Sequence, residues 1–174
     1  MVYMTTKNAV AITGHRAESI PDEAWTRQAI RESLVQMQAS MLIQGMANGV
    51  DLWSAAEAWR AGIPFTSVKP WEGHTAGKKW ENAYQWVVAN SKALEAVSPA
   101  LTYPGVYIYH ARNKWMVDRA DSVLAVWDGR TNGGTFQCIQ YAIQEEKPIY
   151  RINPKTRTIE GWVFGQPPVI ASTT

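Results

Sequence analysis

The sequence predicts a single α/β domain, a doubly wound parallel sheet with helices on both faces. Short apolar segments alternate with helical patterns along the chain, which is typical of parallel strands joined by crossover helices. The 174 residues suffice for one domain with a sizeable core, and 46% of them are hydrophobic. We expect residues 1–165 to form this domain and residues 166–174 to form a loose tail.

The apolar segments give the expected strands. Ser122 to Trp127 is an unbroken apolar run of the kind seen in parallel strands that are buried on both faces. Asn8 to Thr13 is followed at once by glycine, histidine and arginine, as expected for a buried strand that leaves its sheet. The expected strands are residues 8–13, 41–44, 63–68, 93–97, 122–127 and 148–152.

Between these strands, apolar residues recur at the spacing of about 3.6 that amphipathic helices show. Pro21 opens the first helical pattern, and Gly62 stands where the second helix should end. Residues 98–109 are rich in proline, glycine and tyrosine and are expected to form a surface loop, while after Pro154 no periodicity predicts a further element. The expected helices are residues 21–37, 51–61, 78–90, 111–119 and 135–145.

Composition and charge narrow the class of protein. The net charge of +2, from 17 basic and 15 acidic side chains, is too small to predict a nucleic-acid or membrane surface by itself. The apolar runs are much shorter than the ~20 residues of a membrane span, and residues 1–8 show no apolar core of a secretory signal. Cys138 is the sole cysteine, which fits a reducing compartment. We therefore expect a cytoplasmic protein with no membrane partner.

Glycine-bearing segments follow three of the expected strands, at residues 14–16, 45–51 and 128–135. In a doubly wound sheet, ligands bind beyond the carboxyl ends of the strands, where the N-termini of the following helices point. The three segments should therefore meet at one edge of the sheet and form the binding site.

The segment 128–135 gives the strongest indication of phosphate binding. Gly133 and Gly134 let the backbone approach a ligand closely, Thr135 can cap or donate a hydrogen bond, and the next helix presents free N–H groups. The segment lacks both the lysine of a phosphate-binding nucleotidase loop and the spacing of GxGxxG. The alternative is an ordinary strand-to-helix turn that needs glycine for its backbone angles.

The charged residues near these segments have a binding and a structural explanation. Arg16 suits bidentate contact with phosphate or carboxylate, or is simply solvated. Asp51 begins a helix, where it caps that helix or accepts a hydrogen bond from a ribose hydroxyl. Asp118 and Asp121 lie near a helix C-terminus, an unfavourable position that indicates either a specific partner, such as Arg16 or Arg119, or a ligand role.

The sequence does not support a metal centre or a catalytic nucleophile. His15, His74 and His110 lack the spacing of metal ligands, and neither a CxxC pair nor a GxSxG motif is present. Cys138 lies in an amphipathic helical pattern and is expected to be a small core residue. We expect no metal and no cofactor.

Three motifs in this order resemble the SLOG superfamily. They are TGHR at residues 13–16, GMANGVDLWSAAEA at 45–58, and RNKWMVDRADSVLAVWDG at 112–129 followed by GGT and YA. The most similar branch is that of small bacterial and phage proteins of the YpsA/DUF1273 type. The resemblance runs from about Ala9 to Ile152 and implies a Rossmann-like domain whose pocket holds a nucleotide or a nucleotide-derived ligand.

The motif positions and the neighbouring loop residues give the expected binding site. The residues expected to bind the ligand are Gly14, His15, Arg16, Gly45, Gly49, Asp51, Arg112, Asn113, Asp128, Gly129, Gly133, Gly134 and Thr135.

The superfamily includes LOG-type phosphoribohydrolases, which cleave the N-glycosidic bond of a nucleoside 5′-monophosphate. These enzymes carry an arginine that Arg112 matches and a glutamate at a position that Cys138 occupies here. A neutral thiol supplies no charge to an oxocarbenium-like transition state. Catalysis of this kind would therefore use Arg112 for the phosphate or ribose and Asp51 as the carboxylate.

These observations leave three candidate functions. The first, which we favour, is binding of a nucleotide-like small molecule by a sensor or sequestering protein. The second is hydrolysis of a nucleoside monophosphate. The third is single-strand nucleic-acid binding, because the superfamily has a DNA-processing branch and tryptophans stack on bases. Basic residues form no run longer than Lys78-Lys79, so we do not expect a nucleic-acid partner. The nine tryptophans exceed what one small core holds and predict a homo-oligomer, most simply a two-fold dimer.

Overall fold

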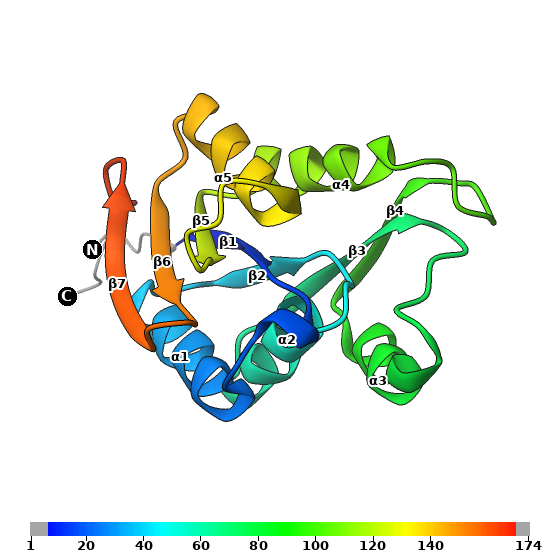
Figure 1. Cartoon of the computed structure of the whole chain (residues 1–174), viewed down its shortest axis with the longest axis horizontal. Coiled ribbons are helices and arrows are strands. Elements are labelled where there is room, and N and C mark those ends of the chain that lie inside the picture. Colours follow the sequence, from blue (N-terminus) through cyan, green and yellow to red (C-terminus); the bar gives the residue numbers. More distant parts are fainter. Residues whose placement is uncertain (1–6, 170–174) are drawn as a thin grey trace, which may run out of the picture.

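Seven strands form a single sheet in the structure, a computed structural model that describes residues 7–169 (Figure 1). The strands are β1 (Ala9–Gly14), β2 (Met41–Gln44), β3 (Phe65–Trp71), β4 (Ala93–Ser98), β5 (Ser122–Val126), β6 (Ile149–Asn153) and β7 (Thr158–Phe164). Their order across the sheet is β4-β3-β2-β1-β5-β6-β7. All neighbours pair in parallel except β6 and β7, which pair antiparallel.

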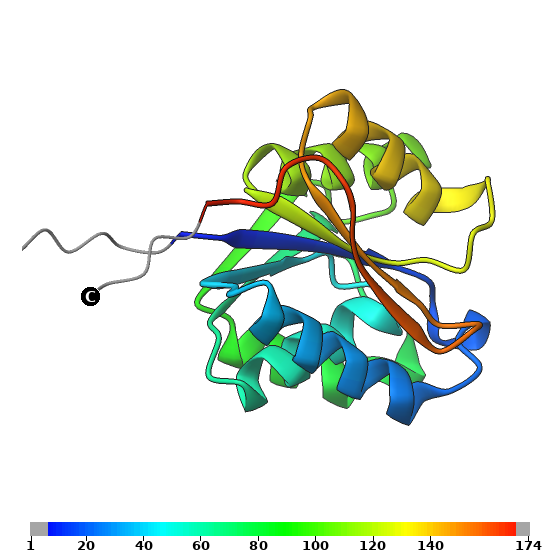
Figure 2. The ribbon, with the colours of Figure 1, turned by 90° about the vertical axis from the view of Figure 1, so that its left-hand side faces the viewer.

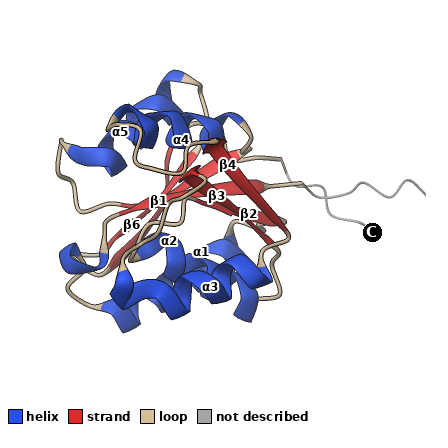
Figure 3. Ribbon diagram, turned by 90° about the vertical axis from the view of Figure 1, so that its right-hand side faces the viewer, coloured by secondary structure: helices blue, strands red, loops and turns tan. Residues whose placement is uncertain are grey.

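Five α-helices cover the two faces of this sheet. They are α1 (Glu23–Gln36), α2 (Val50–Arg60), α3 (Glu81–Asn90), α4 (Tyr107–Asp118) and α5 (Gly133–Gln144). Helices α1, α2 and α3 lie on one face, and α4 and α5 lie on the other (Figure 3). The predicted fold class, a doubly wound sheet with helices on both faces, is confirmed. Its strand order reverses between β1 and β5, which lie side by side in the centre.

The central strands are apolar at consecutive positions because both of their faces are buried. In β5, Leu124 and Val126 join the core cluster on the side of α1 and α2, whereas Val123 and Ala125 join the cluster on the side of α4 and α5. Successive side chains of a strand point to opposite faces, so a strand covered on both sides has no polar face. This arrangement explains the unbroken apolar run at residues 123–126.

The ends of the first two helices follow from local chemistry. The carboxylate of Asp22 accepts a hydrogen bond from the backbone N–H of Trp25 at 3.0 Å, which caps the start of α1. Helix α2 ends at Arg60, and Gly62 follows with φ of +72°, a backbone conformation that glycine adopts without a side-chain clash. Both boundaries agree with the sequence prediction.

Two helices begin earlier than predicted, and the last strand was not predicted at all. Helix α4 begins at Tyr107, where Ile108 is buried in its first turn, so the predicted surface loop is shorter than 98–109. Helix α5 begins at Gly133, within the predicted loop. Strand β7, at the red end of the colour scale in Figure 2, pairs only with β6, at the edge of the sheet. The register of this pair is irregular, and Gly161 within β7 has φ of +76°. The residues of β7 therefore show no regular alternation from which the strand could be predicted. The sheet is therefore mixed rather than wholly parallel.

Residues beyond the last strand add no element within the described range. Residues 166–169 form neither helix nor strand, while the rest of the predicted tail and residues 1–6 lie outside the described residues. None of the helices within residues 7–169 combines the length and the apolar character that a bilayer crossing requires.

Candidate functional site

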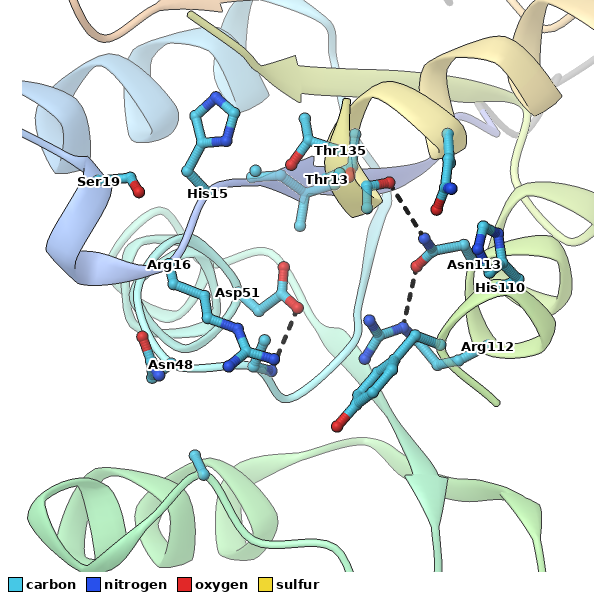
Figure 4. Close-up of a pocket in the computed structure, with 18 of the residues that line it drawn as sticks. Thr13, His15, Arg16, Ser19, Asn48, Asp51, His110, Arg112, Asn113 and Thr135 are labelled. Atoms are coloured by element: carbon cyan, nitrogen blue, oxygen red, sulfur yellow. Dashed lines mark hydrogen bonds between the residues drawn. The ribbon is translucent and has the colours of Figure 1, made fainter. Parts of the chain in front are cut away.

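A cavity of about 590 Å³ opens at the carboxyl end of the parallel strands (Figure 4). Its walls come from the loops that follow β1, β2, β3 and β5 and from one side of α4. Strand order reverses at this edge, and doubly wound sheets bind their ligands at such a reversal. The volume lies in the range of small-molecule sites, roughly 300–1,000 Å³.

Most of the residues predicted to bind the ligand line this cavity. They are Gly14, His15, Arg16, Asp51, Arg112, Asn113, Gly133, Gly134 and Thr135. The predicted residues that do not line it are Gly45, Gly49, Asp128 and Gly129. The structure gives these last four a supporting position around the cavity instead of a place on its wall.

Gly45 and Gly49 are glycines because other segments pass too close for a side chain. A Cβ atom at Gly45 would lie 2.8 Å from the side chain of Arg112, and the Gly45 carbonyl accepts a hydrogen bond from Arg112 Nη1. Gly49 has φ of +84°, and a Cβ atom there would lie 2.4 Å from the backbone nitrogen of Ala17. Both glycines therefore hold segments together beside the site.

Arg112 is the only buried arginine in residues 7–169, and it reaches the cavity from α4. Its Nε donates to Asn113 Oδ1 at 3.0 Å, and its Nη1 donates to the carbonyl of Gly45. Asn113 in turn donates to the carbonyl of Gly134 at the start of α5, at 3.4 Å (Figure 4). These bonds fix the guanidinium between β2 and α5, and its Nη2 makes no hydrogen bond to the described residues.

Asp51 places a buried carboxylate in the cavity wall opposite Arg112. It stands in the first turn of α2, and its Oδ2 accepts a hydrogen bond from the backbone N–H of Ala47 at 3.2 Å. Burial raises the pKa of Asp51, while the positive charge of Arg112 acts in the opposite direction. Asp51 does not cap α2, because the N-cap is Gly49 and no side chain caps this helix, so the capping explanation was wrong. The residue has a structural partner in Ala47 and also faces the ligand space.

His15 is held as a neutral ring by the loop after β5. The backbone N–H of Asp128 donates to His15 Nε2 at 3.1 Å, so this nitrogen carries no proton. Burial lowers the pKa of His15, although the Asp128 carboxylate, 3.3 Å from Nε2, favours the protonated ring. The ring therefore ties β1 to β5.

The Asp128 carboxylate is already occupied by a cation. It forms a bidentate pair with Arg130, whose Nη2 lies 2.6 Å from Oδ2, and these hydrogen bonds lower the pKa of Asp128 to about 2. Gly129 lies between the two residues with φ of +98° and forms the turn. This pairing explains why Asp128 is not part of the cavity wall, while Arg130 is.

The start of α5 leaves its backbone N–H groups available to a ligand. Asn132 precedes the helix without capping it through its side chain, and both Gly133 and Gly134 are exposed. A Cβ atom at Gly134 would meet nothing within 4 Å, so the space above the helix start is open. Unpaired N–H groups at the positive end of a helix favour an anion.

Further residues line the cavity that sequence reasoning did not assign to it. They include Thr13, Asn48, Trp71, His74, Tyr109 and Arg130. The loop after β3 contains Gly73 and Gly77, and it too follows a parallel strand of the same sheet. The topological rule that located the other loops could therefore have located this one.

The position of Cys138 in the core agrees with the sequence prediction. Cys138 is buried in the core beneath α5 as expected, does not line the cavity, and has a thiol pKa raised to about 11 by burial. Within residues 7–169, no three His, Cys, Asp or Glu side chains gather so that they could hold a metal ion.

Asp118 and Asp121 lie away from the cavity and have structural partners. Asp118 accepts a hydrogen bond from the hydroxyl of Tyr141, and Asp121 accepts one from the backbone N–H of Ala9 at 2.9 Å. Neither aspartate pairs with Arg16 or Arg119, so the partners suggested from the sequence were wrong. The expectation that each aspartate has a specific structural partner is confirmed, and neither lines the cavity.

Residues 2–162 match the family model described as DNA recombination-mediator protein A. Among curated proteins, none matches this chain. The match confirms the resemblance to the SLOG superfamily through its DNA-processing branch, while assignment to the YpsA/DUF1273 branch stays a prediction.

Several solved structures share the fold. DNA processing protein A from Streptococcus pneumoniae has a TM-score of 0.66 and 16% identity, and the match covers 84% of this chain and 50% of that one. DNA processing protein A from Helicobacter pylori, described with a single-stranded DNA binding mode, has a TM-score of 0.64 and 21% identity. That match covers 85% of this chain and 66% of the other. The molybdenum cofactor carrier protein from Chlamydomonas reinhardtii has a TM-score of 0.56 and 16% identity, and the match covers 86% of this chain and 79% of that one. The chain thus spans half to two thirds of the two DNA processing proteins.

Proposed function

The chain belongs to the family of DNA recombination-mediator protein A, and on this premise we propose that its cavity binds a nucleotide through the phosphate group. One observation carries the proposal: the buried Arg112 and the uncapped N-terminus of α5 face the same cavity. The ligand is a free nucleotide or a nucleotide-derived molecule, and the protein acts as a sensor or sequestering protein for it.

A phosphate at the start of α5 would meet two kinds of donor. The backbone N–H groups of the first turn have no side-chain cap, and Arg112 keeps its Nη2 free of the described residues. Arg16 adds a third source of positive charge from the loop after β1, where its side chain is exposed. Charge-assisted bonds of this kind contribute about 1.5–3 kcal/mol each, enough to select an anion.

Asp51 offers the complementary group for a sugar. Its carboxylate lies in the wall from α2 and keeps acceptor capacity beyond the hydrogen bond from Ala47. A ribose attached to a phosphate at α5 would present hydroxyl donors toward this wall. The arrangement supports binding of a nucleotide rather than of inorganic phosphate alone.

Single-stranded DNA is the second candidate ligand, and exposed aromatic side chains beside the cavity favour it. Tyr107 is 60% exposed and directly follows Val106, which lines the cavity. Tyr103 is 54% exposed, and its ring packs against that of Tyr109, another lining residue. Aromatic rings at the mouth of a cationic cavity can stack on successive bases. The family membership and these rings favour a nucleic-acid partner, which was not expected from the sequence.

Calorimetric titration with adenosine monophosphate tests the nucleotide proposal. Arg112→Ala should weaken binding by roughly 10- to 100-fold, the loss expected when one charge-assisted hydrogen bond is removed. Arg119→Ala is the matched control, because Arg119 follows α4, stacks on Trp115 and does not line the cavity. Equal affinity of the wild-type and Arg112→Ala proteins would contradict the proposal.

Fluorescence anisotropy with a labelled oligothymidylate tests the second candidate. If DNA uses this site, Tyr107→Ala should weaken its binding, adenosine monophosphate should compete with it, and affinity should fall steeply with salt. Binding that neither the variant nor the nucleotide affects would mean that DNA does not use the cavity.

A further inference from the structure

His74 lies in the turn after β3, at the opposite side of the cavity from α5. Its ring is buried and is held by two aromatic neighbours. Trp71 packs against it edge to face, with ring centroids 4.8 Å apart, and Tyr84 of α3 lies within hydrogen-bond distance of Nδ1, at 3.0 Å. Trp71 also packs against Tyr109, with centroids 6.0 Å apart, so the ring belongs to an aromatic section of the wall.

The hydrogen bonds around Tyr84 decide which nitrogen of His74 carries the proton. The Tyr84 hydroxyl lies 2.8 Å from the backbone carbonyl of His74, and a carbonyl can only accept. The single phenolic proton is therefore used on that carbonyl. The contact between Tyr84 and Nδ1 must then be donated by an Nδ1–H group, so the proton of the neutral ring is on Nδ1.

Burial, together with the positive charges nearby, keeps the His74 ring neutral. Burial, followed by the positive charges of Arg112, Lys69 and Arg16, lowers the pKa of His74 to about 4. At neutral pH the ring thus has one proton, on Nδ1, and a free lone pair on Nε2. No hydrogen bond to Nε2 is formed by the described residues, and the side chain lines the cavity. The site therefore has a fixed, uncharged hydrogen-bond acceptor in the part of the wall that follows β3.

The position of this acceptor relative to the phosphate site identifies the part of a nucleotide that it would meet. His74 follows β3 and α5 follows β5, and the strand order between them is β3-β2-β1-β5. Three strand spacings of about 4.8 Å separate the two positions by roughly 14 Å. With the phosphate at α5 and the sugar near Asp51, which follows β2, the base would extend toward His74.

We propose that His74 selects the base of the bound nucleotide by accepting a hydrogen bond from the amine at position 6 of a purine or position 4 of a pyrimidine, with Tyr84 as the positioning residue. The ligand is accordingly a nucleotide of adenine or cytosine. Adenine N6 and cytosine N4 carry donors, whereas the corresponding positions of guanine and thymine carry carbonyl acceptors. An acceptor on the base would face the Nε2 lone pair and repel it. This inference rests on the proposed nucleotide site.

Two matched pairs of ligands measure this selection by calorimetry. Adenosine and inosine monophosphate differ in the substituent at position 6, and cytidine and uridine monophosphate differ at position 4. We expect each amino nucleotide to bind about 10-fold more tightly than its keto partner, the effect of one buried polar contact that is made or left unpaired. His74→Leu should reduce both ratios to about 1.

Tyr84→Phe tests the fixed proton position and avoids changing the ring itself. Without the phenolic oxygen, Nδ1–H loses its acceptor, so the proton can move to Nε2 and the preference for amino bases should shrink. Tyr141→Phe is the control, because this hydroxyl binds Asp118 outside the cavity, and the ratio should stay as in the wild type. Nitrogen NMR of labelled histidine should show Nδ1 protonated in the wild-type protein and a mixture in Tyr84→Phe.

The outcomes separate this inference from the proposed function. Equal binding of the amino and keto nucleotides, with both weakened by Arg112→Ala, would overturn the role of His74 and leave the nucleotide site standing. Absence of binding by all four nucleotides would overturn both. Circular dichroism shows whether His74→Leu folds. If it does not, two other results would still overturn the inference. One is a wild-type ratio of amino to keto affinity in folded Tyr84→Phe, and the other is a His74 ring protonated on Nε2 in the wild-type protein.

Discussion

At the scale of single residues, the partners of each charged side chain decide what remains for a ligand. Arg130 and Asp128 neutralise each other, and His15 is neutral because a backbone N–H occupies Nε2. Arg112 is also held, yet only through part of its guanidinium. Arg16 and Arg112 therefore bring positive charge to the cavity that no ion pair within residues 7–169 neutralises, which suits a phosphate, while Glu18 and Asp51 bring carboxylates to the same wall.

The first prediction at this scale is that ordinary nucleoside monophosphates are bound without being hydrolysed. The glutamate of LOG-type enzymes is replaced by Cys138, which is buried, neutral at pH 7 and outside the cavity wall. Loss of one electrostatic interaction with the transition state costs roughly 10²–10³ in rate. Chromatography should detect no free base after incubation. Release of base at ordinary enzyme rates, abolished by Asp51→Asn, would show that Asp51 acts as the catalytic carboxylate.

The second prediction concerns pH and the stability of the fold. The pKa of His74 is about 4 in the folded protein and near 6.5 in the unfolded chain, so below pH 6.5 the unfolded chain binds a proton that the folded protein does not. The free energy of unfolding should therefore fall between pH 6.5 and pH 4, by at most about 1.4 kcal/mol per pH unit from this group. Because the pKa of His15 is also lowered, that residue acts in the same direction.

Urea denaturation at pH 7 and pH 5 measures this dependence. His74→Gln should show a smaller decrease in unfolding free energy than the wild type over that interval, because one of the two groups has been removed. His110→Gln serves as the matched histidine control and should retain the decrease. A wild-type decrease in His74→Gln would assign the effect to other groups.

At the scale of elements, a buried carboxylate joins the first two helices. Glu57 of α2 is 1% exposed and binds Arg27 at 2.8 Å and Arg31 at 2.9 Å, both from α1. These helices cover one face of the sheet, α1 follows the loop that carries His15 and Arg16, and α2 carries Asp51 in its first turn. Their packing therefore sets the distance between the loops after β1 and β2.

Glu57→Gln should lower the free energy of unfolding by about 2–3 kcal/mol. The loss is below the 3–5 kcal/mol typical of a fully buried pair, because Arg27 and Arg31 keep access to water. Glu23→Gln removes an exposed i,i+4 partner of Arg27 and should cost less than about 1 kcal/mol. Equal effects of the two substitutions in urea denaturation would contradict the proposed role of Glu57.

The start of α5 is the second element that can be tested by itself. Gly134→Asp places a carboxylate in open space at the positive end of the helix, where it should raise stability by about 0.3–1 kcal/mol while repelling a phosphate. Gly134→Ala is the neutral control and should bind adenosine monophosphate better than Gly134→Asp does. Thermal denaturation and calorimetry measure the two effects. If both variants bind as the wild type does, the phosphate does not lie at α5.

At the scale of the whole molecule, the tryptophans divide between core and surface. Trp53 is buried in the core, whereas Trp59 is 55% exposed and Trp86 is 38% exposed. The two exposed rings pack edge to face, with centroids 5.7 Å apart, and join α2 to α3. We call these two rings the aromatic patch, and it belongs to helices that lie on the face of the sheet opposite α4 and α5 (Figure 3).

We predict that this patch takes part in a two-fold dimer, the oligomer that the tryptophan content first suggested. Exposed aromatic pairs commonly mark interfaces between copies of a chain. Light scattering at micromolar concentrations should give twice the mass of the chain, and Trp59→Ser should shift the mass toward the monomer. Val35→Ser, which changes another exposed apolar side chain, is the control. A monomeric wild-type mass would contradict the prediction.

The sequence by itself determined the alternation of strands and helices and the edge of the sheet where the site lies. Apolar runs such as residues 123–126 mark strands buried on both faces, and the glycines at 133 and 134 mark a helix N-terminus that follows such a strand. These features are local, because each depends on the order of side chains along a few turns or strand positions. The fold class and nine of the residues that line the cavity follow from them.

The tertiary structure alone decided which side chains hold one another and which face the ligand. Arg112 meets the carbonyl of Gly45 across 67 positions of sequence, and His15 meets the backbone of Asp128 across 113. Strand β7 exists because β6 offers it a free edge, although its own residues show no regular alternation. The proton on His74 depends on Tyr84 of another element. Contacts between distant segments leave no periodic pattern in the chain, and only the packed sheet brings these groups within hydrogen-bond distance.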